Sequence, residues 1–423
     1  MSSRKISFIH PTGNPNSREA ALALWEAGLL YEVVTTIAYA PEAWTPYLHL
    51  LPNRIKNRIE RELGRRMWIA PDGVEMRSHP WKEILRVALV RTGVSHRLGL
   101  SNQSLTDWIY ASLDRHVAQS HLDNIDAVYA YEDGAAETFR TAKQRGILCL
   151  YDLPIMFYSM SRDIQTEEAE RFPELASALQ AAKEPAWKIE RKEQEVKLAD
   201  RIFVASSITQ KSLLKFGIKP EKISVIPYGA PLDYFHPQPK PDKAFRAIYV
   251  GRLEPRKGIH YLLNAWRSLQ LKQAELLLVG INEFPTGWLE QYRDTFRYIP
   301  SVPHASLNEY YSSANVLVFP SLVEGFGLVL LEAMACGIPV ITTTNTAGPD
   351  IITDGVEGFI LPICDIEALK DKLEWCYRHP LELAEMGRAA RRKAERLTWG
   401  LYRQKLASEV EALLERQVSS VRH

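Results

Sequence analysis

The chain has 423 residues, of which 46% are hydrophobic and 24% are charged, and its formal net charge is +1. This length is sufficient for two or three domains with full hydrophobic cores. A nearly neutral chain has no overall attraction to polyanions, so nucleic acid is not an expected partner. The four cysteines form no CxxC pair, which argues against a disulfide framework and against a metal held by thiolates.

The N-terminal apolar run is far shorter than the core of a signal peptide, and no stretch of about 20 apolar residues is present. These features predict a cytoplasmic protein. One segment, residues 51–66, would allow contact with the inner face of a membrane. Its apolar residues recur every four positions among six basic residues, as in helices that lie on anionic surfaces. The alternative is a helix packed on its own domain with a solvated basic face.

Short apolar strands alternate with amphipathic helices in the first part of the chain. The first strand is expected at residues 5–9, and a turn containing Gly13 leads into a helix at 17–27, capped by Ser17 and closed by Gly28. Further strands are expected at 127–131, 147–151 and 202–205. Strands separated by helices predict a parallel sheet covered by helices on both faces.

A stretch dense in proline and glycine, residues 226–241, marks a domain boundary, after which the alternation resumes. Strands are then expected at 247–250, 275–279, 316–319, 339–342 and 358–361. We therefore predict an α/β protein with two doubly wound Rossmann-like domains that face each other across a cleft. The predicted domains are residues 1–228, with a mostly helical insertion at about 42–120, and residues 229–398, followed by a C-terminal helix within 399–423 that packs back on the body.

The stretch from Pro320 to Gly337 carries the strongest chemical signal. A buried strand leads into a turn with Gly325 and Gly327, where backbone N–H groups can approach a ligand, and a helix then begins near Leu328. The partial positive charge at a helix N-terminus favours an anion such as a diphosphate. Glu324 in the turn can accept hydrogen bonds from sugar hydroxyls, and Glu332 on the helix can bind a ribose diol. The alternative is an ordinary strand–turn–helix with two surface glutamates.

A second basic stretch follows the strand that ends at Gly251. Arg252 and Lys257 lie in a tight loop at the carboxyl end of this strand, where ligands bind in open α/β sheets. Two cations there would neutralise the charge that develops on a departing nucleotide diphosphate. A solvated basic loop is the alternative interpretation.

The sequence GRLEPRKG, followed about 70 residues later by PSLVEGFGLVLLEAMACGIPVI, resembles glycosyltransferase family 4. Residues 225–235 and 348–362 add further similarity, which is dense over residues 200–400 and thin before them. The resemblance implies the GT-B fold and transfer that retains the configuration of the sugar. It also implies that Glu324 binds the sugar hydroxyls, that Glu332 binds the ribose, and that Arg252 and Lys257 bind the diphosphate.

The resemblance further implies that the backbone from Gly325 through Phe326 and Gly327 to Leu328 touches the donor, and that Gly13 approaches the diphosphate from the first domain. Leaving-group stabilisation with front-face attack then needs no enzyme nucleophile and no cofactor besides the nucleotide sugar itself. Asp-x-Asp pairs of the kind that hold a divalent cation under a diphosphate are absent from the sequence, which predicts metal-independent transfer.

The acceptor side departs from the family at the strand end where many members carry a histidine. Glu132 and Asp133 stand near that position and would contact the acceptor or receive its proton, although Asp133-Gly134 is also a typical turn. His10, at the end of the first strand, would face the same region, unless its role is purely structural.

The sequence thus predicts a retaining enzyme that moves a sugar from a nucleotide diphosphate, with UDP-sugars preferred and GDP-mannose next, to a hydroxyl of a glycan, lipid or small-molecule acceptor. A catalytically inactive sugar-nucleotide-binding regulator is the alternative. A nucleotide-sugar epimerase or a glycan phosphorylase is a rival enzyme class, but the sequence shows no lysine site for pyridoxal phosphate.

Overall fold

The computed structural model describes residues 4–37, 68, 71–179 and 181–421. The chain divides into two compact units, each made of segments that are distant in sequence. The first unit comprises Met1–Asp152, Ala186–Phe203 and Arg403–His423, and the second comprises Leu153–Pro185 and Val204–Tyr402. The boundaries expected near residues 228 and 398 stay a prediction.

The first sheet has seven strands in the order β3-β2-β1-β4-β5-β6-β7. Its central strands are fully buried, and the pairs that join β1 to β2 and β4, β2 to β3, and β4 to β5 are all parallel. The strands are β1 Ile6–Ile9, β2 Leu30–Thr35, β3 Glu75–Ser78, β4 Ala127–Tyr131, β5 Leu148–Leu153, β6 Arg201–Val204 and β7 Ile223–Val225.

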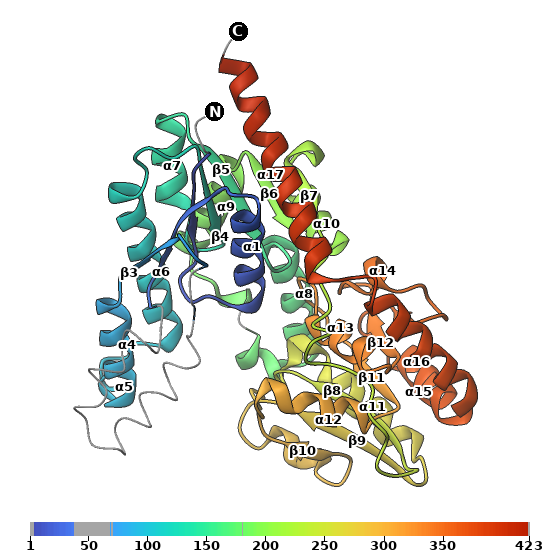
Figure 1. Cartoon of the computed structure of the whole chain (residues 1–423). Helices are drawn as coiled ribbons and strands as arrows, with labels where there is room; N and C mark the ends of the chain where they lie inside the picture. The colour runs from blue at the N-terminus through green and yellow to red at the C-terminus, as the bar shows by residue number, and fades with distance from the viewer. Residues whose placement is uncertain (1–3, 38–67, 69–70, 180, 422–423) are drawn as a thin grey trace, which may run out of the picture. The chain divides into compact units, whose positions relative to one another are not determined.

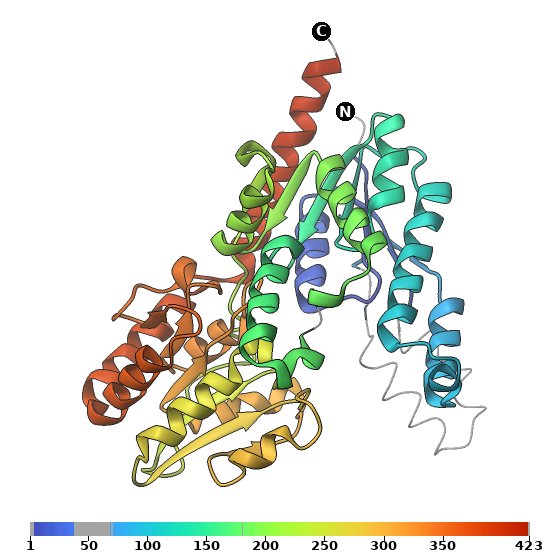
Figure 2. The ribbon, with the colours of Figure 1, turned by 180° about the vertical axis from the view of Figure 1, so that it is seen from behind.

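Two helical layers cover the first sheet. Helices α6, α7 and α9 pack side by side, while α1 and α17 lie on the other face, as Figures 1 and 2 show from opposite sides. Ion pairs link α17 to α1, because the guanidinium of Arg403 on α17 lies 2.6 Å from the Glu19 carboxylate and 2.9 Å from the Glu26 carboxylate, both on α1. The helices are α1 Pro15–Glu26, α4 Trp81–Arg91, α5 Val94–Arg97, α6 Asn102–Ser120, α7 Ala136–Gln144, α9 Ala186–Leu198 and α17 Trp399–Val421.

Helix α1 begins earlier than the sequence pattern predicts. Asn14, not Ser17, is the N-cap: its side chain accepts a hydrogen bond from the Ser17 N–H at 2.8 Å, and Pro15 occupies the first helical position. The expected end is confirmed, since Gly28 follows the last turn in the left-handed conformation, with φ of 68°.

The second unit is built on a six-stranded sheet with the order β10-β9-β8-β11-β12-β13, and all its pairings are parallel. Helix α11 packs on α15, and α13 packs on α12 and α16. Helix α11 lies on one face of this sheet, which is turned to the viewer in Figure 2, and α12 and α13 lie on the other face, which is turned to the viewer in Figure 1. The strands are β8 Phe245–Val250, β9 Ala274–Val279, β10 Arg297–Ile299, β11 Val316–Phe319, β12 Val340–Thr343 and β13 Gly358–Leu361.

The remaining helices of the second unit are short or connect its layers. They are α8 Tyr158–Arg171, α10 Ser207–Phe216, α11 Ile259–Leu269, α12 Leu307–Ser312, α13 Leu328–Ala335, α14 Gly348–Ile351, α15 Ile366–Arg378 and α16 Pro380–Ala394. Single 3-10 turns lie at Pro173–Ala178, Ala181–Lys183, Pro220–Lys222, Pro255–Lys257, Trp288–Tyr292 and His304–Ser306. Within the described residues, no helix has both the length and the apolar character that a membrane span requires.

Segments that precede residue 229 contribute to the core of the second unit. Met156 and Ile208 belong to the same buried apolar cluster as Tyr261, Leu322 and Val323. On α8, the buried carboxylate of Glu168 accepts a hydrogen bond from the Tyr261 hydroxyl at 2.9 Å. The loop that follows β11 therefore packs against residues that come long before it in the sequence.

Candidate active site

The turn between β11 and α13 has the geometry that its two glycines predict. Gly327 stands directly before α13 in the left-handed conformation, with φ of 89°, and a Cβ there would lie 2.8 Å from the ring of Phe319. A Cβ on Gly325 would lie 1.8 Å from the carbonyl oxygen of Pro154. No side chain fits at either position, so the backbone itself forms this surface at the N-terminus of the helix.

Hydroxyl groups hold the turn in place. The carbonyl oxygen of Gly325 accepts hydrogen bonds from the hydroxyls of Ser206 and, at 3.2 Å, Thr209, both buried at the start of α10. Phe326 directs its ring into the core against Tyr228, with ring centroids 5.0 Å apart, so a ligand could meet only its backbone. Leu328 is the first residue of α13 and is partly buried.

Lys257 and Glu324 form a buried ion pair at this turn. The ammonium of Lys257, at the end of the 3-10 turn after β8, donates a hydrogen bond to Oε2 of Glu324, and the two side chains keep 11% and 14% of their exposure. Burial lowers the pKa of Lys257 although Glu324 opposes the shift. Burial raises the pKa of Glu324, but the charges of Lys257 and Arg256 outweigh it, so the net shift is downward and the carboxylate stays ionised.

Arg256 is a member of this site to which the sequence pattern assigns no role. Its guanidinium donates to the Val323 carbonyl at 3.0 Å and pairs with Glu254 at 2.5 Å, and it contributes to the field that keeps Glu324 ionised. The basic run GRLEPRKG contained the residue, but nothing in it shows that Arg256 points inward while Arg252 points outward. The burial of one arginine and the exposure of the other are decided by the fold.

Arg252 lies on the same loop but is more than half exposed. Its guanidinium pairs with Glu283, which follows β9, and its carbonyl oxygen accepts a hydrogen bond from the Tyr249 hydroxyl at 2.7 Å. Arg252 and Lys257 therefore each have a carboxylate partner of their own, Glu283 and Glu324. An exposed pair of this kind is worth about 0–1 kcal/mol, so Arg252 can change partners at little cost.

Glu332 is nearly buried within α13. Its carboxylate accepts hydrogen bonds from the Tyr311 hydroxyl at 2.7 Å and from His304 Nε2 at 2.9 Å. The hydrogen bond to Glu332 raises the pKa of His304, although partial burial opposes it. Each carboxylate oxygen can accept a second hydrogen bond, so these contacts leave capacity for a diol. Neither partner was predictable, because both lie more than 20 residues away in sequence without a motif.

In the first unit, His10 and Gly13 belong to one turn. His10 is buried, and its Nδ1 accepts hydrogen bonds from the N–H groups of Gly13 at 2.8 Å and Thr12 at 3.2 Å. Burial lowers the pKa of His10 to about 3, so the ring is neutral at physiological pH. Gly13 has φ of 62°, and a Cβ there would lie 2.3 Å from the indole of Trp68. These contacts give His10 a structural place in the turn, while its role toward an acceptor stays a prediction.

Glu132 and Asp133 lie at the end of β4 and pair with lysines of α9. Lys192 stands 3.4 Å from Glu132, and Lys188 stands 3.0 Å from Asp133. Asp133 adopts the left-handed conformation, with φ of 65°, and its N–H donates to Glu195 at 3.0 Å, as in a tight turn. The structure thus gives both residues defined partners within the first unit, and their predicted roles toward an acceptor stay predictions. The basic segment 51–66 lies outside the described residues.

Both parallel sheets are Rossmann-like, and a glycine turn precedes a helix at the carboxyl edge of the second sheet, which is the arrangement of the GT-B fold. The two Rossmann-like parallel sheets predicted from the sequence are confirmed. Residues 233–393, all within the second unit, match the family model of glycosyl transferases group 1.

Curated relatives are similar over part of the chain. A D-inositol 3-phosphate glycosyltransferase of Kribbella flavida is 30% identical over 244 residues, which cover 52% of this chain and 58% of that protein. The O-antigen chain mannosyltransferase B of Escherichia coli is 36% identical over 132 residues, or 29% of this chain and 34% of that protein. The chain thus spans little more than half the length of the first of these relatives.

Solved structures show the same fold over the whole chain. Sucrose-phosphate synthase from Thermosynechococcus elongatus has a TM-score of 0.63 at 20% identity, and the match covers 99% of this chain and 100% of that one. HepE from Anabaena, in complex with UDP-glucose, has a TM-score of 0.59 at 16% identity, and the match covers 96% and 99% of the two chains.

Proposed function

We propose that this protein transfers a sugar from a nucleotide diphosphate sugar to a hydroxyl group of a glycan, lipid or small-molecule acceptor, with retention of the anomeric configuration. The observation that carries the proposal is the buried Lys257–Glu324 pair beside the glycine turn that precedes α13. Cationic groups and the N-terminus of a helix are brought together there, as the stabilisation of a leaving diphosphate requires.

Each residue has a distinct part in this proposal. Lys257 stabilises the charge that develops on the diphosphate as the glycosidic bond breaks. Glu324 fixes the position of the Lys257 ammonium and accepts hydrogen bonds from sugar hydroxyls. Arg252 leaves its exposed pair with Glu283 and binds the diphosphate, while Glu332 accepts from the ribose. The attacking hydroxyl approaches on the face from which the nucleotide departs, which is how such a transfer retains configuration without a covalent intermediate.

UDP-sugars are the preferred donors in this proposal, with GDP-mannose next. Two observations support a nucleotide sugar. Residues 233–393 match the family model of glycosyl transferases group 1, and HepE, which has a similar fold, was crystallised with UDP and with UDP-glucose. We further propose that transfer needs no divalent metal, because the lysine, the arginines and the helix N-terminus supply the positive charge that a metal would otherwise provide.

The test is a panel of nucleotide sugars, each incubated with the full chain in the presence and absence of EDTA. A donor that raises the melting temperature and is slowly hydrolysed with EDTA present supports the proposal, and the anomer of the first-formed product tests retention. Binding without hydrolysis or transfer to any acceptor would instead support the inactive sugar-nucleotide-binding regulator. Failure of every nucleotide sugar to bind would refute both.

Two substitutions test the site itself. Lys257→Ala and Glu324→Ala are each expected to lower turnover by on the order of a hundredfold, which is typical for the loss of one contact to the transition state. Lys219→Ala and Glu309→Ala, at exposed positions of the same unit, are the matched controls and should retain normal turnover. Near-normal turnover in both site variants would exclude this assignment.

A further inference from the structure

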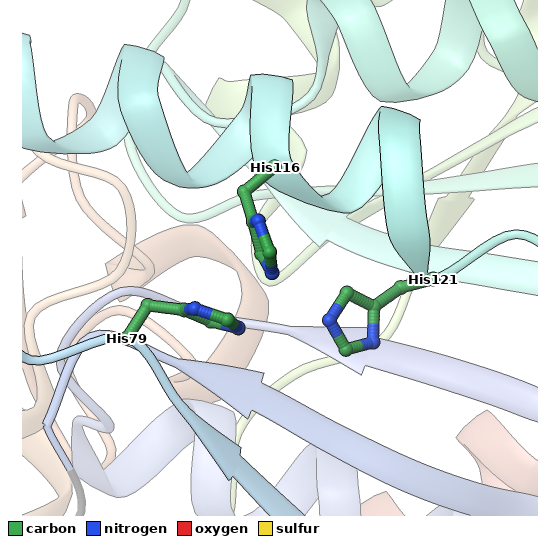
Figure 3. Close-up of side chains that lie close together, drawn as sticks. All are labelled: His79, His116 and His121. Atoms are coloured by element: carbon green, nitrogen blue, oxygen red, sulfur yellow. The ribbon is translucent and has the colours of Figure 1, made fainter.

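Three histidines to which no role is assigned above converge in the first unit. His79 directly follows β3, His116 lies in the last turns of α6, and His121 caps the end of that helix. One ring nitrogen from each lies within 4.8 Å of those of the other two. Figure 3 shows a nitrogen of each ring pointing toward its neighbours. The proposed sugar transfer gives these three side chains no role.

The close spacing of the rings favours neutral imidazoles in this cluster. Rings as close as His79 and His116, with centroids 3.6 Å apart, cannot both be charged without strong repulsion. Neutral imidazoles each offer a lone pair, which is the form that binds metal.

A buried carboxylate fixes the orientation of the third ring. Nδ1 of His121 lies 3.1 Å from both carboxylate oxygens of Glu32, which is 4% exposed and accepts a hydrogen bond from the Ser7 hydroxyl at 2.8 Å. This contact places the proton of His121 on Nδ1 and turns the lone pair of Nε2 toward the other two histidines. A carboxylate behind a histidine is the usual second partner of a metal-binding imidazole.

We propose that His79, His116 and His121 bind a divalent transition-metal ion of the zinc type. Three imidazole ligands favour zinc and its neighbours over magnesium or calcium, which prefer oxygen. Tetrahedral bonds of about 2.0–2.1 Å would bring the nitrogens to within about 3.4 Å of one another. To reach this geometry the nitrogens must move together by about 1 Å each, and the rings of His79 and His116, whose centroids are 3.6 Å apart, must turn away from each other. His79 and His116 also line a hollow of about 370 Å³, from which water or a small anion can occupy the fourth position.

The environment of the hollow indicates an anionic fourth ligand. Lys82 and Arg115 line it together with the two histidines, and Lys82 is held over the ring of Trp108 at 5.0 Å. The metal ion and these two cations would attract a small anion. This site does not depend on the proposed sugar transfer, since none of the three histidines takes part in it, and Lys257, Glu324 and Glu332 belong to the second unit.

The experiment uses the full chain without an affinity tag, stripped with EDTA and then freed of it. Titration with Co²⁺ should give the visible absorption of a four-coordinate ion at one equivalent, and Zn²⁺ should displace it. His116→Ala should lose this signal and bind Zn²⁺ at least a hundredfold more weakly. Glu32→Gln, which leaves all three imidazoles in place, should weaken binding by about 10- to 100-fold.

His96→Ala is the control, because His96 is exposed on α5 of the same unit. It should bind Co²⁺ and Zn²⁺ as the unchanged chain does. Equal affinity in the His116→Ala and His96→Ala variants would overturn the proposal, as would a Co²⁺ spectrum of six-coordinate, water-bound ion only. Donor turnover is also measured with and without EDTA in the His116→Ala variant. An effect of EDTA that persists in this variant comes from a metal requirement of the transfer and not from loss of the histidine-bound ion.

Discussion

The buried pair between Lys257 and Glu324 allows a quantitative prediction. Removal of one member leaves the other charged and buried without its partner, whereas replacement of both leaves two uncharged side chains in contact. We therefore consider three variants: Lys257→Met, Glu324→Gln and the double substitution. Met keeps the length of the lysine stem, and Gln keeps the shape of the glutamate, so the lost interaction is mainly electrostatic.

The size of the effect follows from burial. Breaking a fully buried ion pair by removing one partner costs about 3–5 kcal/mol. The two side chains keep 11% and 14% of their exposure, so some water still reaches them, and we expect about 2–4 kcal/mol for a single change. In a domain of 150–250 residues, 1 kcal/mol corresponds to about 2–4 °C in Tm. Each single variant should therefore melt roughly 4–16 °C lower.

The two single variants should not be equal. Without Lys257, the carboxylate of Glu324 still has the charge of Arg256 and the N–H of Gly325 nearby. Without Glu324, the Lys257 ammonium remains beside the positive charge of Arg256, which lowers its pKa further. We expect Glu324→Gln to be the less stable variant. Its stability should rise with pH up to the ordinary pKa of lysine, because the unfolded chain binds a proton that the folded chain does not.

The assay is urea unfolding followed by fluorescence and circular dichroism, at pH 7 and pH 9. The double variant should be more stable than the sum of the single effects predicts, by at least about 1 kcal/mol. Arg252→Ala, which removes an exposed pair, should change stability by no more than about 1 kcal/mol. Additive single effects, with a coupling below about 0.5 kcal/mol, would show that this pair carries no buried-charge energy and would refute the reasoning.

Three further predictions concern other residues. Because burial lowers the pKa of His10 to about 3, the free energy of unfolding should fall by about 2 kcal/mol as the pH falls from 6.5 to 5. His10→Asn should flatten this pH dependence in urea unfolding, and an unchanged slope would contradict the pKa shift. Gly13→Ala should destabilise the folded protein by about 1–3 kcal/mol more than Gly28→Ala. Both glycines have positive φ, but only at Gly13 would a Cβ lie 2.3 Å from an aromatic ring, that of Trp68. Thermal unfolding of the two variants measures the difference. Glu332→Gln should lower the pKa of His304, measured by NMR titration, and an unchanged pKa would exclude the hydrogen bond to Glu332 as the cause of the raised value. The same variant should raise KM for the donor more than it lowers kcat.

The elements that could be predicted are those whose burial shows in local sequence. Strands expected at 127–131, 316–319 and 358–361 are found with those bounds, because each is a continuous apolar run between turn residues. Helix α13 begins at Leu328, as its glycines indicate. Strand β3, with the sequence EMRS, was not predicted, because it lies at the edge of its sheet and has hardly any apolar residues.

The partners in the candidate site were less accessible to prediction. The motif placed Glu324 and Lys257 at the ends of neighbouring strands, β11 and β8, but gave no reason for a direct ion pair rather than two solvated charges. Glu332 has its partners 21 and 28 residues away, on a segment without any recognisable pattern. The histidine cluster has no sequence signal either, because His116 lies 37 positions after His79, and only the tertiary fold brings the end of β3 beside the last turns of α6.

The hydrogen bonds from the Ser206 and Thr209 hydroxyls to the Gly325 carbonyl determine where this protein can be cut into separately expressed fragments. A fragment that begins at residue 229 would contain every motif residue of the second sheet, yet it would lack both hydroxyls and the Pro154 backbone that faces the glycine. The glycine carbonyl would turn to water, and the loop would be free to relax. A recombinant second half that is to keep its ligand site must therefore carry residues 153–185 and 204–228 as well, joined by a linker across the gap.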